Sequence, residues 1–192
     1  MKRIIQCFLV FVSVVYSINT FAFDQNRKGF FLSVGGGLQS VSVDEVNFGA
    51  PDEARSIGGF ATSFKVGSGL TEQFALYYVR NLSWFDASVS SRRSFMYTSG
   101  IAGVGGSYYF NENTRSAYVL GAVGFGDFDA PFAVNIEPNL GSAVMLGVGY
   151  EFSKRKAFEA TALFIDVGED STSDDFGSAI QSIQLTYNYM WY

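Results

Sequence analysis

The sequence predicts an all-β fold, a transmembrane antiparallel up-and-down β-barrel of eight strands with short periplasmic turns and long extracellular loops. Three observations support this prediction. Short segments of alternating polarity recur along the chain, as in strands that have one apolar face. The connections between these segments alternate between long and short. The chain is rich in Gly, Phe and Tyr, yet after residue 22 no stretch approaches the 18 consecutive apolar residues of a membrane helix.

Residues 1–22 have the pattern of a secretory signal peptide. Lys2 and Arg3 precede an apolar run, and Thr20-Phe21-Ala22 places small residues where a signal peptidase cleaves. An uncleaved membrane helix is the alternative, but the apolar run is shorter than the ~20 residues that a span needs. We therefore expect export through the Sec pathway, cleavage after Ala22, and a single barrel domain over 23–192.

The mature composition excludes several classes of protein. The chain has no His, and its one cysteine, Cys7, lies within the signal peptide. A Ser-His-Asp triad, a Cys-His pair, a disulfide and a cysteine-ligated metal are therefore impossible in the mature chain. Removing Lys2 and Arg3 leaves 11 basic and 18 acidic residues, a net charge of −7. A chain this acidic is a poor candidate for nucleic acid, and no cofactor is expected.

Each of the eight predicted strands is long enough, or nearly so, to cross a bilayer at a tilt. They cover 29–41, 59–67, 74–85, 95–110, 117–126, 143–152, 157–167 and 178–191. After the odd strands come polar loops, "SVDEVNFGAPDEARSIG", "DASVSSRRS", "DFDAPFAVNIEPNL" and "GEDSTSDDFG". After the even strands come the short turns "SGLTEQ", "NENTRS" and "SKRK". This asymmetry is typical of bacterial outer-membrane barrels.

The face of each residue is clearest in the first, sixth and eighth strands, where alternate residues differ in polarity. We expect lipid contact for Phe30, Leu32, Val34 and Leu38, for Val144, Leu146, Val148, Tyr150 and Phe152, and for Ile183, Leu185, Tyr187, Tyr189 and Trp191. The residues between them face the lumen. The fourth and fifth strands are rich in Gly and Ala on both faces, and their register stays open.

Aromatic rings are expected at both membrane interfaces, where an amphipathic ring is stable. For the periplasmic interface the candidates are Phe30, Tyr77, Tyr108, Phe110, Tyr118, Tyr150, Phe152, Phe158, Tyr187, Tyr189 and Trp191. For the outer interface they are Phe60, Trp84, Phe95, Tyr97, Phe125 and Phe164.

Four charged residues fall within the predicted strands, namely Lys65, Arg80, Glu151 and Glu159. An Arg or Lys on the lipid face near the midplane costs on the order of 2 to 4 kcal/mol, so all four are placed inside. We expect an interior ion-pair network that plugs the narrow barrel. The alternative for Glu151 and Glu159, which flank a turn, is a position at the rim in water.

The external loops hold the candidates for ligand contact. Arg92 and Arg93 in the second loop are predicted to contact lipopolysaccharide phosphates. The acidic residues of the other loops keep them soluble or let divalent cations bridge them to lipopolysaccharide. Asp170, Asp174 and Asp175 lack both the spacing of a calcium loop and any fixed geometry for catalysis. No metal site or catalytic residue is assigned.

With these features in place, the mature chain resembles the OmpA/OmpX-type eight-stranded outer-membrane β-barrel family. "GVGYEFSKRKAFEATALF" looks like a periplasmic hairpin of such barrels. "LTYNYMWY" looks like the C-terminal insertion signal read by the barrel assembly machinery, which would be a partner during biogenesis. Its residues are Leu185, Tyr187, Tyr189, Trp191 and Tyr192. Here the alternating set ends on Trp191, whereas in the family it includes the last residue.

The resemblance implies a non-enzymatic surface protein, integral to the bacterial cell outer membrane. Its external loops would contact lipopolysaccharide or a host or phage ligand, in adhesion, serum resistance or envelope integrity. The alternative is a narrow OmpW-like channel for small or hydrophobic solutes. A soluble lipocalin-like barrel is a third interpretation, and it would have apolar residues inside and polar residues outside.

Overall fold

A computed structural model describes residues 27–43, 55–90, 93–113, 115–132, 139–167 and 178–192. The predicted signal peptide and most of the predicted external loops lie outside these residues, as does the predicted cleavage site. Among the described residues no helix is long and apolar enough to cross a membrane.

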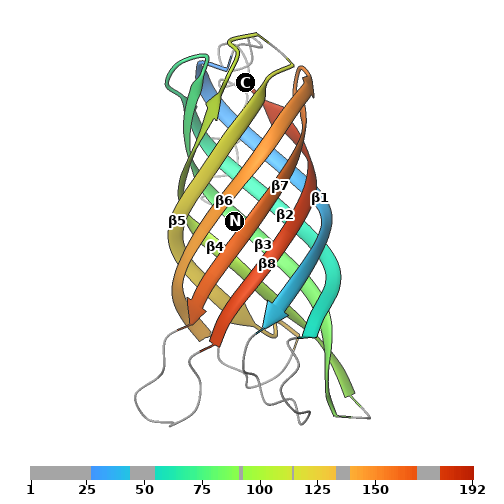
Figure 1. The fold of residues 1–192 in the computed structure, drawn as a ribbon. Helices are drawn as coiled ribbons and strands as arrows, with labels where there is room; N and C mark the ends of the chain where they lie inside the picture. Colours follow the sequence, from blue (N-terminus) through green and yellow to red (C-terminus); the bar gives the residue numbers. More distant parts are fainter. Residues whose placement is uncertain (1–26, 44–54, 91–92, 114, 133–138, 168–177) are drawn as a thin grey trace, which may run out of the picture.

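Eight antiparallel strands form a closed barrel in which each strand pairs with its neighbours in sequence and β8 pairs with β1 (Figure 1). The predicted fold class is therefore confirmed. The strands are β1 Gly29–Val43, β2 Arg55–Gly69, β3 Phe74–Ser90, β4 Arg93–Tyr109, β5 Ala117–Asp129, β6 Asn139–Ser153, β7 Lys156–Val167 and β8 Ser178–Trp191.

The two ends of the barrel differ in their connections. At the end drawn uppermost in Figure 1, which we call the turn end, the segments 70–73, 110–116 and 154–155 join consecutive strands. Tyr192, the last residue, lies at the same end. The opposite end, which we call the loop end, carries the connections after β1, β3, β5 and β7.

Strand pairing is staggered around the barrel. If one starts at Leu32 and moves from each residue to its paired residue on the next strand, the path around the barrel returns to β1 at Ser42. Ser42 is ten positions from Leu32, toward the loop end. Closure with a stagger of this size requires strands tilted by roughly 40°. The tilt shortens the height that each strand spans, so that strands of 12 to 17 residues cross a bilayer and extend beyond it.

The prediction of the second external loop is wrong for most of that segment. "DASVSSRRS" was expected to be a loop, but β3 continues to Ser90 and β4 begins at Arg93. Asp86 pairs with Met96, and Ala87 pairs with Phe95. Backbone hydrogen bonding does not require apolar side chains, so the ladder continues through Ser-rich sequence. A register shift between Ser88 and Ser90 marks a bulge near the tip of this hairpin.

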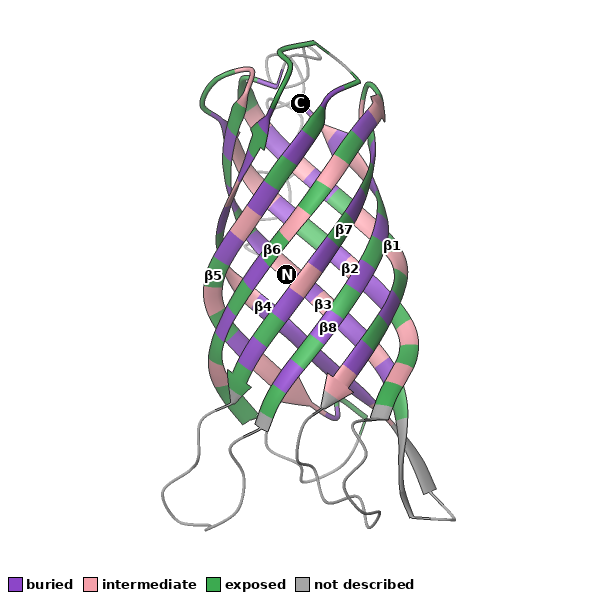
Figure 2. Ribbon diagram, viewed as in Figure 1, coloured by how far each residue is buried: buried purple, intermediate pink, exposed green. Residues whose placement is uncertain are grey.

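Burial alternates along the strands with a period of two (Figure 2). The exposed outer positions are mostly large and apolar, and the expected faces of the first, sixth and eighth strands agree with the structure. Apolar outer residues of the eight strands include Val34, Leu38, Phe60, Phe64, Leu76, Tyr78, Val104, Tyr108, Val119, Val123, Phe125, Leu146, Val148, Phe158, Phe164, Ile183 and Leu185. A soluble lipocalin-like barrel would have the opposite polarity, so this third interpretation is wrong.

The register of β4 and β5, which the sequence left open, follows from the same alternation. Tyr109 of β4 and Tyr118 of β5 are buried inside, whereas Tyr108 and Val119 beside them are exposed outside. Three predicted interface rings therefore face the lumen instead of the bilayer, namely Tyr77, Tyr97 and Tyr118. The side chain of Phe95 lies outside the described residues.

The polarity of the outer face gives a first prediction. Leu146, on the outside of β6, is 57% exposed, and Leu70, in the turn 70–73, is 52% exposed. Leu146→Arg should lower the unfolding free energy by about 2 to 4 kcal/mol because the cation faces hydrocarbon. Leu70→Arg places the same side chain in water and should change it by less than about 0.5 kcal/mol. Urea unfolding in lipid vesicles measures both, and equal losses would contradict a lipid-facing exterior.

Candidate functional site

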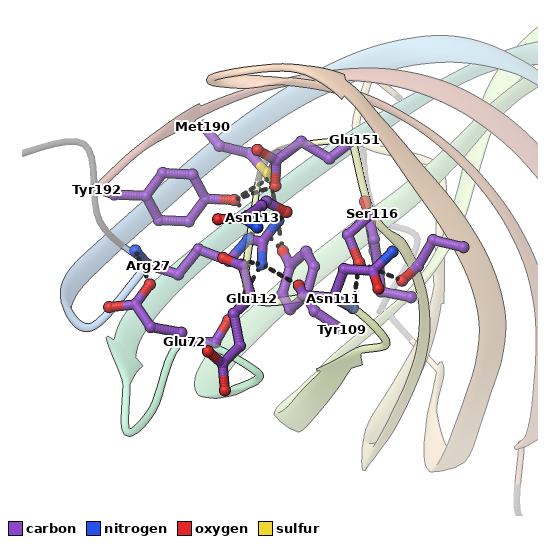
Figure 3. Close-up of polar contacts among 12 residues, drawn as sticks. Arg27, Glu72, Tyr109, Asn111, Glu112, Asn113, Ser116, Glu151, Met190 and Tyr192 are labelled. Carbon is purple, nitrogen blue, oxygen red and sulfur yellow. Dashed lines mark hydrogen bonds and ion pairs between the residues drawn. The ribbon is translucent and has the colours of Figure 1, made fainter.

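Arg27 closes the turn end of the barrel. It immediately precedes Lys28 and β1, yet only 4% of it is exposed. Its Nε lies 3.0 Å from Oε2 of Glu151 on β6, and its guanidinium carbon lies 4.1 Å from the ring centroid of Tyr109 on β4 (Figure 3). A buried carboxylate thus neutralises this cation, and an aromatic face stabilises it further.

The same guanidinium group also joins two of the turns. Its terminal nitrogens donate hydrogen bonds of 2.7 to 3.3 Å to backbone carbonyl groups in the turns 70–73 and 110–116 (Figure 3). A planar group with five donors is suited to several acceptors at once, which an ammonium group is not. The acceptors are the carbonyl oxygens of Glu72, Asn111, Glu112 and Asn113.

Tyr192 completes this cluster from the C-terminus. The residue is 3% exposed, and its hydroxyl donates to Oε2 of Glu151 at 3.3 Å. It also lies 3.4 Å from the hydroxyl of Tyr109 and 3.2 Å from the sulfur of Met190. Burial raises the pKa of the Tyr192 phenol well above its ordinary value, so the group remains a neutral donor.

Because Tyr192 faces inward, Trp191 is the last of the alternating residues of β8 that face outward. Leu185 and Tyr187 are exposed on the outer face, and Tyr189 and Trp191 are half-buried there. The alternation of these residues is therefore as the sequence analysis expected it. Their use as an insertion signal stays a prediction.

Lys65 and Glu159 form a second buried ion pair within the lumen. The Lys65 Nζ donates to both carboxylate oxygens of Glu159 at 2.5 and 2.6 Å, and the two side chains are 1% and 2% exposed. The Tyr118 hydroxyl donates to Glu159 at 2.7 Å, and the ring of Tyr77 lies 5.4 Å from the Lys65 nitrogen. These contacts offset the cost of removing two charges from water.

Two glycines make room for the rings beside this ion pair. A Cβ atom on Gly149 would lie 2.2 Å from the Tyr118 ring, and one on Gly105 would lie 2.8 Å from the Tyr77 ring. Each tyrosine ring therefore occupies space that the side chain of any larger residue at the glycine position would need. Glycine at these positions allows a lumen this narrow to be filled with rings.

Between the ion pairs and the loop end, the lumen is packed first with polar and then with apolar side chains. Near the middle, Asn81 donates to Gln184, and the amide of Gln184 donates to Ser83. Closer to the loop end, the ring of Phe128 lies 5.4 Å from that of Tyr97 and 6.3 Å from that of Phe85. Buried side chains thus occupy the lumen from the turn end to the level of Phe85 and Tyr97, and the partly buried Ile57 and Phe128 pack against them.

The structure separates the four residues predicted to form one interior network. Lys65 and Glu159 lie in contact, whereas Glu151 pairs with Arg27. The rim alternative for the two glutamates is wrong, because Glu151 and Glu159 are 1% and 2% exposed. Arg27 was missed because the strand pattern begins only at Gly29.

Of the four predicted network members, Arg80 lies on the outer face of the barrel. The prediction that it faces the lumen is therefore wrong. Its strand neighbours Phe64 and Tyr78 are exposed outside, and its guanidinium donates to both carboxylate oxygens of Asp127 at 2.6 and 2.7 Å. Asp127 was assigned to a loop, but it lies within β5. The pair crosses the outer face of β4 above the small residue Gly100. Pairing of the two charges permits a cation that lipid would otherwise exclude.

Arg92 and Arg93 were predicted to contact lipopolysaccharide. Arg92 and the side chain of Arg93 both lie outside the described residues, so this contact stays a prediction. Within the described part of the chain, no group of three or more His, Cys, Asp and Glu residues has the arrangement of a metal site.

The Arg27 cluster gives a second prediction. Arg27→Met leaves Glu151 buried without its cation, and the unfolding free energy should fall by about 3 to 5 kcal/mol. Arg27→Lys should recover only part of the loss, because an ammonium group cannot reach both turns and the carboxylate. The double variant Arg27→Met/Glu151→Met should be more stable than Arg27→Met alone. Urea unfolding measures all three, and a loss below 1 kcal/mol in Arg27→Met would contradict the role of the cluster.

The outward ion pair gives a third prediction. Asp127→Leu leaves Arg80 unpaired against lipid and should lower the unfolding free energy by about 2 kcal/mol, the lower end of the range for such a cation. Arg80→Leu/Asp127→Leu removes both charges and should be at least as stable as the wild type. If the double variant were as unstable as the single one, the outer placement of this pair would be wrong.

Comparison with solved structures supports the fold. The attachment invasion locus protein Ail of Yersinia pestis, in complex with the heparin analogue sucrose octasulfate, is similar at a TM-score of 0.53 and 14% identity, over 84% of this chain and 99% of that one. A second structure of Ail gives a TM-score of 0.51 and 15% identity, over 84% and 98%. Neisserial surface protein A is similar at a TM-score of 0.49 and 14% identity, over 84% and 96%.

No protein-family model and no curated protein matches the chain. At these identities the likeness extends to the fold. The predicted resemblance is confirmed at that level: the chain has the eight-stranded barrel fold of outer-membrane proteins.

Proposed function

We propose that this protein is a non-enzymatic surface protein of the bacterial outer membrane whose external loops contact a ligand. The observation that carries the proposal is the filled lumen. Two buried ion pairs, Arg27–Glu151 and Lys65–Glu159, together with tyrosine rings, occupy the turn-end half of the barrel. A barrel filled in this way has its outer face and its loops available for binding.

The alternative function, a narrow OmpW-like channel for small or hydrophobic solutes, would require this packing to open. A path through the barrel must displace Arg27 from its carboxylate and from two turns, and then separate Lys65 from Glu159. Breaking a buried ion pair costs about 3 to 5 kcal/mol.

The composition of the loops points to the kind of ligand. The connections 44–54, 133–138 and 168–177 contain nine acidic residues and no basic one. Ail is similar in fold and binds a sulfated heparin analogue, but loops of this charge would repel such an anion. A basic host or phage ligand, or lipopolysaccharide phosphates bridged by divalent cations, is the better electrostatic match. Arg92 and Arg93 are the proposed direct contacts to phosphate.

Loop exchange tests the surface role. Each of the connections 44–54, 133–138 and 168–177, and the tip of the β3–β4 hairpin, 88–94, is replaced in turn by a short Gly-Ser segment, and cells are assayed for adhesion, serum survival and phage sensitivity. At least one exchange should remove one of these properties while the barrel still shows heat-modifiable mobility on gels. Full retention of all three properties in every exchange would overturn the surface-binding role.

Conductance in planar bilayers separates the two functions and is a fourth prediction. The wild-type barrel should show no discrete openings because the lumen is packed. Lys65→Ala/Glu159→Ala removes the second buried pair with its charges balanced and should give small openings if the barrel remains folded. Discrete openings of the wild-type barrel at neutral pH would instead support the channel.

A further inference from the structure

The turn between β6 and β7 carries the densest positive charge among the described residues. Lys154, Arg155 and Lys156 follow one another, and Lys154 and Lys156 are exposed. Lys156 is the first residue of β7 and lies on the outer face, where its paired residue on β8 is Tyr189. We call these three residues the basic turn.

Five aromatic rings lie on the outer face next to the basic turn. Phe152 lies 5.2 Å from Phe158 and 6.2 Å from Tyr187, measured between ring centroids. Tyr189 and Trp191 lie 4.7 Å apart on the neighbouring strand. We call these five residues the aromatic platform. Rings in such a position lie at the level of lipid head groups.

The backbone of the basic turn is strained at Arg155. Arg155 has a φ of 71°, in the left-handed region, where a residue with a Cβ atom is less stable than glycine by roughly 1 to 2 kcal/mol. The turn is fixed in this shape by a hydrogen bond from the Met190 N–H to the Arg155 carbonyl. Glycine would relieve the strain, so Arg155 can be replaced by glycine without destabilising the turn.

The other turns at this end lack such an excess of positive charge. Glu72 lies in the turn 70–73, and Glu112 and Arg115 lie together in the turn 110–116. Arg115 also has a positive φ, 69°. The chain as a whole is acidic, so the basic turn has a sign opposite to that of the molecule. A local cation cluster beside membrane-interface rings is the chemical complement of an anionic lipid head group.

We propose that the basic turn and the aromatic platform together bind an anionic glycerophospholipid in the leaflet at the turn end of the barrel. The cations bind the phosphate groups, and the rings pack against the glycerol and the upper acyl chains. The inference rests on placement of the barrel in a membrane. It is independent of the proposed contacts at the loop end.

Trp191 makes the site measurable. The chain has two tryptophans, and Trp84→Phe leaves Trp191 as the only one. The full mature barrel with this change is placed in phosphatidylcholine vesicles that contain a minority of either brominated phosphatidylglycerol or brominated phosphatidylcholine. Bromine quenches tryptophan fluorescence on contact. Trp191 should be quenched more by the anionic lipid than by an equal content of the neutral lipid, and salt should reduce the difference.

Substitutions in the basic turn should remove this preference stepwise. Arg155→Gly should reduce the preference for phosphatidylglycerol by roughly fivefold, the usual contribution of one cation near a membrane surface. Lys154→Gln/Arg155→Gly/Lys156→Gln should abolish it. Because glycine relaxes the backbone at position 155, the barrel should fold at least as well as the parent, and gel mobility with and without heating verifies this.

Arg115→Gly is the matched control. It removes an arginine of the same backbone conformation from a turn that lacks the excess of positive charge, and the preference should be retained. Equal quenching by the two lipids in the parent barrel would overturn the proposal. So would an unchanged preference in the triple variant, or a loss in Arg115→Gly as large as that in Arg155→Gly. None of these outcomes bears on the loop-exchange experiment.

Discussion

Closure of the hydrogen-bonded ladder between β1 and β8 is the constraint on which the rest of this structure depends. In hydrocarbon no water is present to pair with a free strand edge, so every backbone group in the span must find a partner within the barrel. Closure with eight strands gives a lumen only wide enough for side chains. The outward residues must then be mostly apolar, and the inward residues must fill a narrow space with their charges paired.

The charges of this chain follow from that constraint. Inside, Arg27 and Lys65 each meet a carboxylate and an aromatic ring, and each pair is supported by a tyrosine hydroxyl. Outside, Arg80 is compatible with the lipid-facing surface because both nitrogens at the end of its side chain reach Asp127. At the turn end, Arg155 and its neighbours lie beside the outer aromatic rings, where we propose that lipid head groups bind. Pairing satisfies the charges within the span.

Several features of the fold were readable from the sequence because they depend on the period of two. Alternation within a strand can be read without knowing how that strand pairs with its neighbours. It therefore predicted the eight strands, the faces of β1, β6 and β8, and the position of Trp191 on the outer face. The prediction of the faces failed where the alternation of polarity was weak. In β4 and β5, small residues on both faces hid the register, and Tyr118 was placed toward lipid although it faces the lumen. The Ser-rich hairpin after Phe85 was missed because ladder pairing needs no apolar pattern.

The sequence by itself determined that this chain forms a barrel with an apolar outer face, because strand length and alternating polarity are local properties. Only the tertiary structure decided which charges meet. Arg27 and Glu151 are separated by 124 positions, and Lys65 and Glu159 by 94, so no local pattern links them. The stagger of the strands brings each pair to one height within the lumen. For Arg80 the assumption that every strand cation faces inward was wrong, since it left out a partner two strands away on the same outer face.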